Sequence, residues 1–186
     1  MKALTLWPEW LWVIRYLGKR VENRRWKLPT NMFWKPVLLH AGMCVGGGKV
    51  IQGLEWVKAM AINANVDCVR DGDCLHFTKK IFSSLSLLPS GLVTSQIADV
   101  KTTLQLHLRE LNLGKIVGVT VFSNCHQRYG KWCVDGQWQW EMAYVRFFLE
   151  PVPCRGWQKL WNVSPEIMSL VEKQLLGFSL LDKGWE

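Results

Sequence analysis

Four charged residues of complementary chemistry lie within a six-residue stretch near the start of the chain: Lys19, Arg20, Glu22 and Arg24. If residues 21–24 form a strand, alternate side chains share a face, so Glu22 and Arg24 lie side by side. Lys19 is then expected next to Glu22. Arginine pairs with phosphate oxygens, a desolvated lysine has a lowered pKa, and a carboxylate can orient a ligand or move protons. We therefore predict a site for a polar ligand with phosphate or amide groups; the alternative is a surface ion network worth under ~1 kcal/mol.

The elements that must position this cluster follow from the apolar pattern, one proline and one glycine. Residues 2–6 read as a strand, and Pro8 suits the first turn of a following helix. Gly18 is expected to end that helix. Further strands are expected at residues 21–26 and 36–40. The charged cluster therefore begins where a helix ends and continues along a strand.

The same region resembles the signature of ASCH domains, a branch of the PUA-like β-barrel proteins that is associated with RNA. The matching positions run from the first strand to the end of the third: Leu4-Thr5-Leu6, Pro8, Trp10, Ile14, Lys19, Glu22, Arg24, Trp26 and Leu38-Leu39-His40-Ala41. A second match comes late in the chain, at residues 115–121, 148–156 and 160–161. Two departures are Leu17, where the family usually has glycine, and Pro8, which sits one place early.

The resemblance implies an α+β fold, a PUA-like mixed β-barrel with peripheral helices. Residues 1–186 are expected to form a single ASCH-like domain whose barrel segments are 1–45 and 114–163. Ser164, Pro165 and Glu166 then predict the start of a C-terminal helix over 164–177, followed by a loose tail.

Residues 51–113 differ in character, and we predict a helical insertion between the two barrel segments. Helices are expected at residues 53–64, 76–88 and 94–113. The third has a stripe of apolar residues spaced three and four apart: Ile97, Val100, Leu104, Leu108 and Leu111. The block is interpreted as scaffold, a lid or a surface for a protein partner.

Twelve tryptophans in 186 residues provide many candidate surfaces for stacking on bases. Trp26, Trp132, Trp138 and Trp140 are the candidates for a ligand groove, and Trp138 and Trp140 share one face of an expected strand because Gln139 alternates with them. Three further indoles are assigned to core packing: Trp10, Trp56 and Trp161. The predicted ligand-binding set is Lys19, Arg20, Glu22, Arg24, Trp26, His40, Trp138 and Trp140.

The net charge of +8 falls mainly in the two ASCH-like segments. Residues 1–30 hold seven basic and two acidic side chains, and residues 114–161 hold six and three. Residues 51–113 hold six of each sign. A basic groove attracts phosphate backbones through release of counterions, which favours RNA as a partner.

Six cysteines are present, and their spacing does not match that of a zinc site. No metal or other cofactor is therefore expected. Residues 1–17 do not read as a secretory signal, and no apolar run reaches the roughly 20 residues that cross a bilayer. We expect free thiols, a cytoplasmic location and no membrane association.

Binding of RNA or of a modified nucleoside is the leading hypothesis for function. The second is an enzyme in which Lys19 and Glu22 act in catalysis. Some ASCH relatives resemble acetylcytidine amidohydrolases, in which a threonine stands where this chain has Glu22, so a carboxylate would act as general base on water. Other relatives are ribonucleases, for which Glu22, His40 or His126 could be the base. The third hypothesis is an adaptor that binds a protein through residues 51–113.

Overall fold

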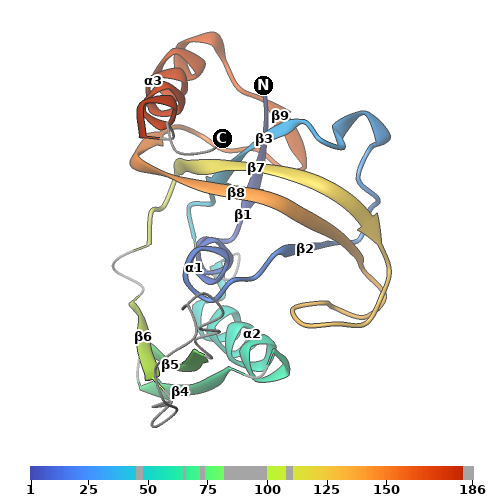
Figure 1. The fold of residues 1–186 in the computed structure, drawn as a ribbon, viewed down its shortest axis with the longest axis vertical. Helices are drawn as coiled ribbons and strands as arrows, with labels where there is room; N and C mark the ends of the chain where they lie inside the picture. Colours follow the sequence, from blue (N-terminus) through green and yellow to red (C-terminus); the bar gives the residue numbers. More distant parts are fainter. Residues whose placement is uncertain (45–47, 65, 72–73, 82–99, 108–110, 182–186) are drawn as a thin grey trace, which may run out of the picture.

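The fold comes from a computed structural model, which describes residues 1–44, 48–64, 66–71, 74–81, 100–107 and 111–181. It is an α+β architecture in which a six-stranded mixed sheet curls into a half-barrel (Figure 1). Three α-helices are described: α1 (Pro8–Tyr16), α2 (Val50–Asn63) and α3 (Pro165–Leu181). A separate three-stranded sheet lies beyond α2, at the opposite end of the molecule from α3 (Figure 1). The expected α+β class is confirmed, and the sheet is compatible with a barrel-like fold.

The six strands of the curled sheet come from both ends of the chain, in the order β2-β8-β7-β3-β1-β9. Their bounds are β1 (Lys2–Leu6), β2 (Val21–Arg24), β3 (Pro36–Ala41), β7 (Lys115–His126), β8 (Trp138–Pro153) and β9 (Leu160–Asn162). β1 and β3 pair in parallel, and the remaining neighbours pair antiparallel. The strands expected at residues 2–6, 21–26 and 36–40 are therefore present as β1, β2 and β3, within a few residues at their ends.

The apolar strands at the centre of the sheet are covered on both faces, which explains their nearly continuous hydrophobic sequences. Leu4 and Leu39 pack with α1 on the inner face, whereas Ala3 and Leu38 pack with α3 on the outer face. Alternate residues of one strand thus enter two different cores.

Irregular pairing produces the curl of the sheet. The register shifts between Leu39 and His40 on β3 and at three places along β7. Such bulges increase the local twist and bend of a strand. Gly118 lies at one of these places, and a Cβ there would be 2.2 Å from the carbonyl oxygen of Arg146 on β8. The close approach of β7 and β8 therefore requires glycine at this position.

The insertion is only partly helical, so the prediction for residues 51–113 is corrected. The first expected helix, at 53–64, is confirmed by α2. The second and third are wrong wherever the structure describes them, because the chain forms β5 (Cys74–Ile81) and β6 (Val100–His107) there. The rest of both expected helices lies outside the described residues. A further strand, β4 (Asp67–Asp71), lies between the first and second expected helices.

The physical reason is that the leucines also fit a strand. Leu104 and Leu106 alternate with polar residues, and the threonine pair at 102–103 is β-branched, which favours an extended chain. Leu75 and Leu106, paired across β5 and β6, are both fully buried against α2. Leu111, the last residue of the expected helical stripe, is half-buried against the same cluster.

The C-terminal helix is longer than expected. α3 continues to Leu181, so the expected tail is helical over residues 178–181. Among the described residues, no helix has the length and apolar character needed to cross a membrane.

Candidate functional site

Lys19, Glu22 and Arg24 form one chain of ionic contacts. The Nζ atom of Lys19 is 3.5 Å from Oε2 of Glu22, and the other carboxylate oxygen is 3.0 Å from Nε of Arg24. Glu22 and Arg24 share a face of β2, as the alternation of strand side chains predicts. Gly18, with φ at 73°, ends the region of α1 and turns the chain so that Lys19 reaches back to the carboxylate.

Lys19 is one of the most deeply buried side chains in the described part of the protein, at 1% exposure. Its ammonium group donates to the carbonyl oxygen of Val21 and lies 5.6 Å from the ring centre of Trp10. Burial lowers the pKa of Lys19 below its ordinary value, and the carboxylate of Glu22 opposes that shift. The Lys19 side chain is thus shielded from solvent and lies beside the carboxylate of Glu22 and the ring of Trp10.

Arg24 connects the cluster to the far side of the sheet. Its Nη2 atom donates to the carbonyl oxygen of Thr5 at 2.9 Å, while its Nε faces Glu22. Thr5 belongs to β1, whereas Arg24 belongs to the edge strand β2. The guanidinium group therefore spans the open side of the half-barrel and is fixed at both ends.

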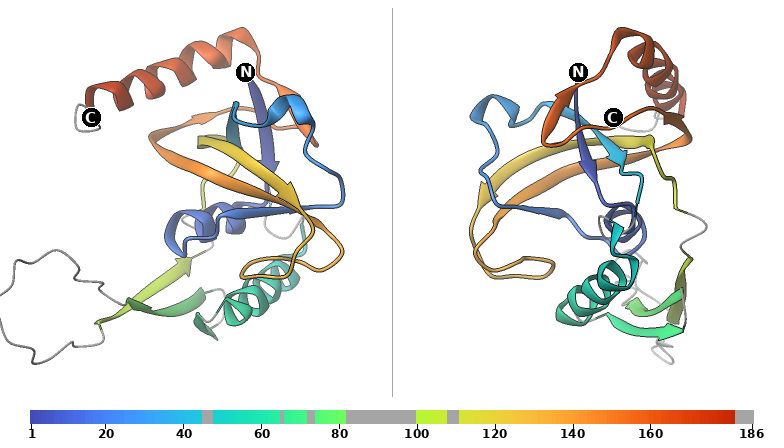
Figure 2. Two further views of the ribbon diagram at one scale, coloured as in Figure 1. Left: turned by 45° about the vertical axis from the view of Figure 1, so that its right-hand side comes forward. Right: turned by 180° about the vertical axis from the view of Figure 1, so that it is seen from behind.

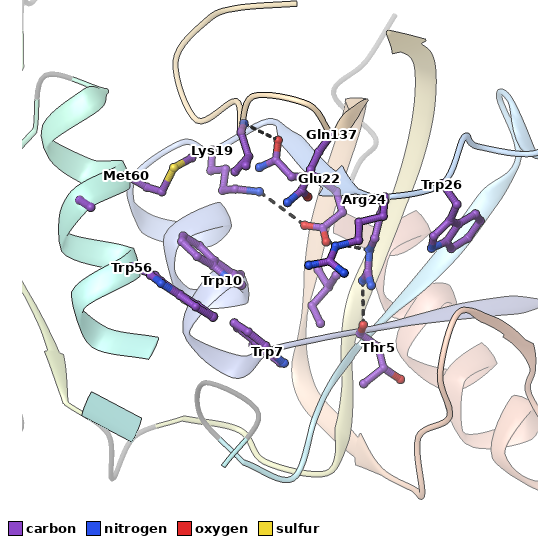
Figure 3. Close-up of a pocket in the computed structure, with 15 residues that line it drawn as sticks. Thr5, Trp7, Trp10, Lys19, Glu22, Arg24, Trp26, Trp56, Met60 and Gln137 are labelled. Atoms are coloured by element: carbon purple, nitrogen blue, oxygen red, sulfur yellow. Dashed lines mark hydrogen bonds and ion pairs between the residues drawn. The ribbon is translucent and has the colours of Figure 1, made fainter. Parts of the chain in front are cut away.

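These three side chains lie at a cleft of about 710 Å³, within the roughly 300–1,000 Å³ typical of small-ligand sites. Four parts of the chain line it: β1 with α1, the segment from 19 to 26, helix α2, and the loop between β7 and β8 (Figure 3). The lining residues are Thr5, Leu6, Trp7, Trp10, Lys19, Glu22, Asn23, Arg24, Arg25, Trp26, Trp56, Ala59, Met60, Val134 and Gln137.

The cleft is positively charged. Its lining contains three cations, Lys19, Arg24 and Arg25, and a single carboxylate, that of Glu22. One cation is balanced by Glu22, so the site as a whole attracts an anionic group.

Indole rings form much of the wall. Trp7 and Trp56 stack with their planes 8° apart and their centres 5.1 Å apart. Trp26 lies on the other side of the charged cluster from Trp7 (Figure 3). Trp26 is held edge-on by Trp140, with ring centres 4.4 Å apart, and its carbonyl oxygen accepts from Nε1 of Trp140 at 3.2 Å.

Four of the eight residues predicted for ligand binding line the cleft, and four do not. Lys19, Glu22, Arg24 and Trp26 line it. Arg20, His40, Trp138 and Trp140 do not, and the structure gives each of them a different environment, as follows.

Arg20 turns away from the cleft and donates to the carbonyl oxygens of Ile14 and Lys19 at the end of α1. Trp140 is 0% exposed and belongs to the core around α1. Trp138 packs partly against that core, with the ammonium group of Lys27 at 5.4 Å from its ring centre. Trp132, the fourth candidate indole, is buried in the cluster around α2.

His40 is buried and joins three segments. Its Nε2 lies 3.1 Å from the carbonyl oxygen of Cys154, which can only accept, so Nε2 carries the proton. Nδ1 then accepts from the hydroxyl of Thr5 at 3.3 Å, and that hydroxyl oxygen accepts from Nε1 of Trp161 at 3.1 Å. Burial lowers the pKa of His40. The neutral ring thus has a structural role in this arrangement, connecting β1 and β3 to the closing segment of the sheet.

Sequence reasoning missed part of the wall. Trp10 and Trp56 were assigned to the core, yet both line the cleft, and Trp56 is 41% exposed. Trp7 and Met60 also line it without having been singled out. The missing signal was long-range, because no local pattern indicates that α2 packs next to the charged cluster.

No cysteine is among the described residues that line the cleft. No group of three or more His, Cys, Asp and Glu that could hold a metal ion occurs in the described ranges. Cys44, Cys68, Cys125, Cys133 and Cys154 are free thiols. Burial raises the pKa of Cys68 to about 11 and also raises the pKa of Cys133 and of Cys154, which disfavours the reactive thiolate.

The comparisons with known proteins add no relative to this geometry. No protein-family model matches the chain, and a search of curated proteins finds no significant match.

Proposed function

We propose that the cleft binds a nucleobase together with its phosphate, as part of RNA or of a modified nucleotide or nucleoside. The observation that carries this proposal is the buried ionic chain of Lys19, Glu22 and Arg24 at a cleft walled by indole rings. Each part of that site suits a different part of the ligand.

The rings of Trp7, Trp26 and Trp56 suit the faces of bases, because base–aromatic stacking contributes ~1–3 kcal/mol per base and tolerates any sequence. The excess positive charge of the lining suits a phosphate. Glu22 accepts hydrogen bonds, so its carboxylate suits the N–H groups at the edge of a base. Since Glu22 is already fixed by two cations, it is preorganised for that contact.

The assignment to an ASCH-type domain is part of the proposal. It is supported by the two motif runs, by the curled mixed sheet that they build, and by the place of the motif residues Lys19, Glu22 and Arg24 at the cleft. The cytoplasmic location expected from the sequence is likewise proposed.

Titration of intrinsic tryptophan fluorescence with single-stranded oligonucleotides and with nucleoside monophosphates tests the proposal. We expect quenching with an affinity that falls steeply as salt rises, and Arg24→Ala should weaken binding by at least tenfold. Arg155→Ala is the matched control, because Arg155 is exposed, lies over Trp157 and does not line the cleft. Binding that responds to neither salt nor Arg24→Ala would refute the proposal.

One observation favours a second candidate function, hydrolysis. A lysine whose pKa is lowered by burial, 3.5 Å from a carboxylate, is typical of groups poised to transfer protons. On an acylated cytidine, Glu22 would take a proton from water, whose oxygen attacks the acyl carbon. The C–N bond then breaks and a proton passes to the leaving amine. On RNA, the lysine would stabilise charge developing on phosphorus-bound oxygens.

Product analysis distinguishes turnover from binding. Acylated cytidine and labelled RNA are incubated with the protein and with Lys19→Met, which keeps the apolar stem of the buried side chain. Hydrolysis requires product with the wild type and at least a hundredfold slower release with the variant. If the wild type gives no product from either substrate, the enzyme hypothesis is wrong, and binding stands alone.

A further inference from the structure

The loop between β7 and β8, residues 127–137, presents an unusual tip. Tyr129 is 88% exposed, and its neighbours Arg128 and Lys131 are exposed as well. Neither cation has an ion pair among the residues that the structure describes. The loop has a single acidic residue, Asp135, whose Oδ1 accepts from the amide of Gly136 within the loop itself. The tip of the loop therefore exposes the Tyr129 ring to solvent, together with the side chains of Arg128 and Lys131.

This exposure occurs on a firmly held loop. Asn23 on β2 donates to the carbonyl oxygen of Trp132 at 2.8 Å and accepts from the amide of Val134 at 3.0 Å. The amide nitrogen of Gln139 donates to Val134 and Gln137, and its oxygen accepts from the backbone of Arg128. The ring of Trp132 is buried against the cluster around α2. The tip is thus fixed at both ends of the loop.

The loop is also continuous with the cleft. Val134 and Gln137 line the cleft, and Asn23, which holds the loop in place, lines it too. In Figure 3 the loop that carries Gln137 passes directly beside Lys19 and Glu22. Figure 2 shows the hairpin reaching past the curled sheet toward α2. One part of this loop therefore borders the cleft, and the same loop carries the exposed tip.

We propose that the partner is a single-stranded RNA long enough to leave the cleft and contact the tip, where a base stacks on Tyr129 and phosphates pair with Arg128 and Lys131. This inference rests on the proposed function and chooses, within it, a polynucleotide over a free nucleoside. Stacking platforms combined with basic side chains are the means by which proteins hold single strands. A nucleoside confined to the cleft would gain nothing from an exposed ring and two cations outside it.

The test compares ligands of increasing length: cytidine monophosphate and oligocytidylates of two, four and eight nucleotides, measured by fluorescence quenching and calorimetry. We expect affinity to rise at least tenfold from monophosphate to octamer. Tyr129→Ala should cost the octamer roughly tenfold in affinity and leave the monophosphate unchanged. The double variant Arg128→Ala/Lys131→Ala should lower the slope of log affinity against log salt by roughly 1.4, at ~0.7 per phosphate contact.

Matched controls keep the result specific. Lys173→Ala removes an exposed cation from α3, at the far end of the molecule (Figure 1). This variant should change the affinity for neither the monophosphate nor the octamer. If the octamer binds no better than the monophosphate, or the tip variants leave it unaffected, the inference is overturned while the proposed function stands. If Arg24→Ala changes nothing and the tip variants alone reduce binding, the proposed function fails. If a tip variant weakens the monophosphate equally, the tip belongs to the cleft and the polynucleotide inference fails.

Discussion

Arg24 donates to the backbone carbonyl oxygen of Thr5 at 2.9 Å, although three strands separate β2 from β1 in the sheet. The Arg24 side chain thus links β2 to β1 across the open side of the half-barrel, where the two strands share no backbone hydrogen bonds. The same guanidinium group contacts Glu22. Arg24 therefore takes part both in the link between β1 and β2 and in the ionic contacts of the cleft.

Arg24→Lys should therefore fail to replace arginine. A lysine has one nitrogen where arginine has three, and it cannot reach Glu22 and Thr5 together with the geometry of a planar guanidinium. We expect the free energy of unfolding to fall by about 1–2 kcal/mol, measured by urea titration followed by circular dichroism. An unchanged urea midpoint would show that the contact with Thr5 contributes nothing to closure.

Glu22→Gln should destabilise the protein more strongly. The substitution leaves the buried ammonium group of Lys19 and the guanidinium group of Arg24 without an anion. Removing one partner of a buried ion pair costs about 3 kcal/mol or more, and the retained amide oxygen reduces that to about 2 kcal/mol. Glu172→Gln, at an exposed site on α3, is the matched control and should stay within about 0.5 kcal/mol of wild type. Equal effects of the two substitutions would contradict the buried role of Glu22.

Acid should weaken the fold through His40. Its pKa in the folded protein lies below the ordinary value of 6.5, so the folded state favours the neutral ring and unfolding takes up a proton. The stability that the neutral ring contributes is fully present above about pH 6.5 and is lost as pH falls through the lower folded pKa. The urea midpoint of unfolding should therefore decrease as the pH is lowered from 7 to 5.

The variant His40→Gln isolates that contribution. It should be less stable than wild type at pH 7, because it loses contacts to Thr5 and Cys154. The difference between the two proteins should shrink toward pH 5. A difference that stays constant with pH would assign the decline to other groups.

Gly156→Ala should be costly because of His40. A Cβ at position 156 would lie 2.2–2.3 Å from two ring atoms of that histidine, which is fixed on both sides and cannot move aside. Overpacking of this kind costs about 2 kcal/mol. Gly130→Ala is the matched control: its Cβ would lie at an ordinary 3.5 Å from Sγ of Cys133, so the urea midpoint should hardly change. If both variants unfold at the same midpoint, the imidazole does not pack on this backbone as described.

The elements around the charged cluster are predictable from sequence because their determinants are local. Pro8 and Gly18 set the ends of the helical segment, and two-residue alternation places Glu22 beside Arg24. The burial of Lys19 is not local. Trp10 lies beside its ammonium group, and helix α2, some thirty residues further along the chain, contributes Trp56 and Met60 to the same cleft.

The errors have a common cause. The stripe through Leu104 and Leu111 satisfies a helical period, but Leu104 and Leu106 also satisfy a strand period, and the pairing of β6 with β5 decides between them. Trp138 and Trp140 do share the strand β8, but residues on other strands determine how far each indole is buried. Trp140 is fully buried in the core, with its ring centre 5.4 Å from that of Phe122. Local alternation could not reveal those partners.

Helix α1 packs into two different cores. Leu11 and Ile14 enter the core of the curled sheet, whereas Val13 and Leu17, the residue that caps the helix, enter the one formed by α2 and the three-stranded sheet. The nine-residue helix α1 thus belongs to both hydrophobic cores. If either core unfolded alone, the apolar side chains of α1 on that side would be exposed to water. Both halves of the molecule should consequently melt in a single cooperative transition, and a ligand in the cleft, which Trp10 of α1 and Trp56 of α2 both line, would raise the melting temperature of both together.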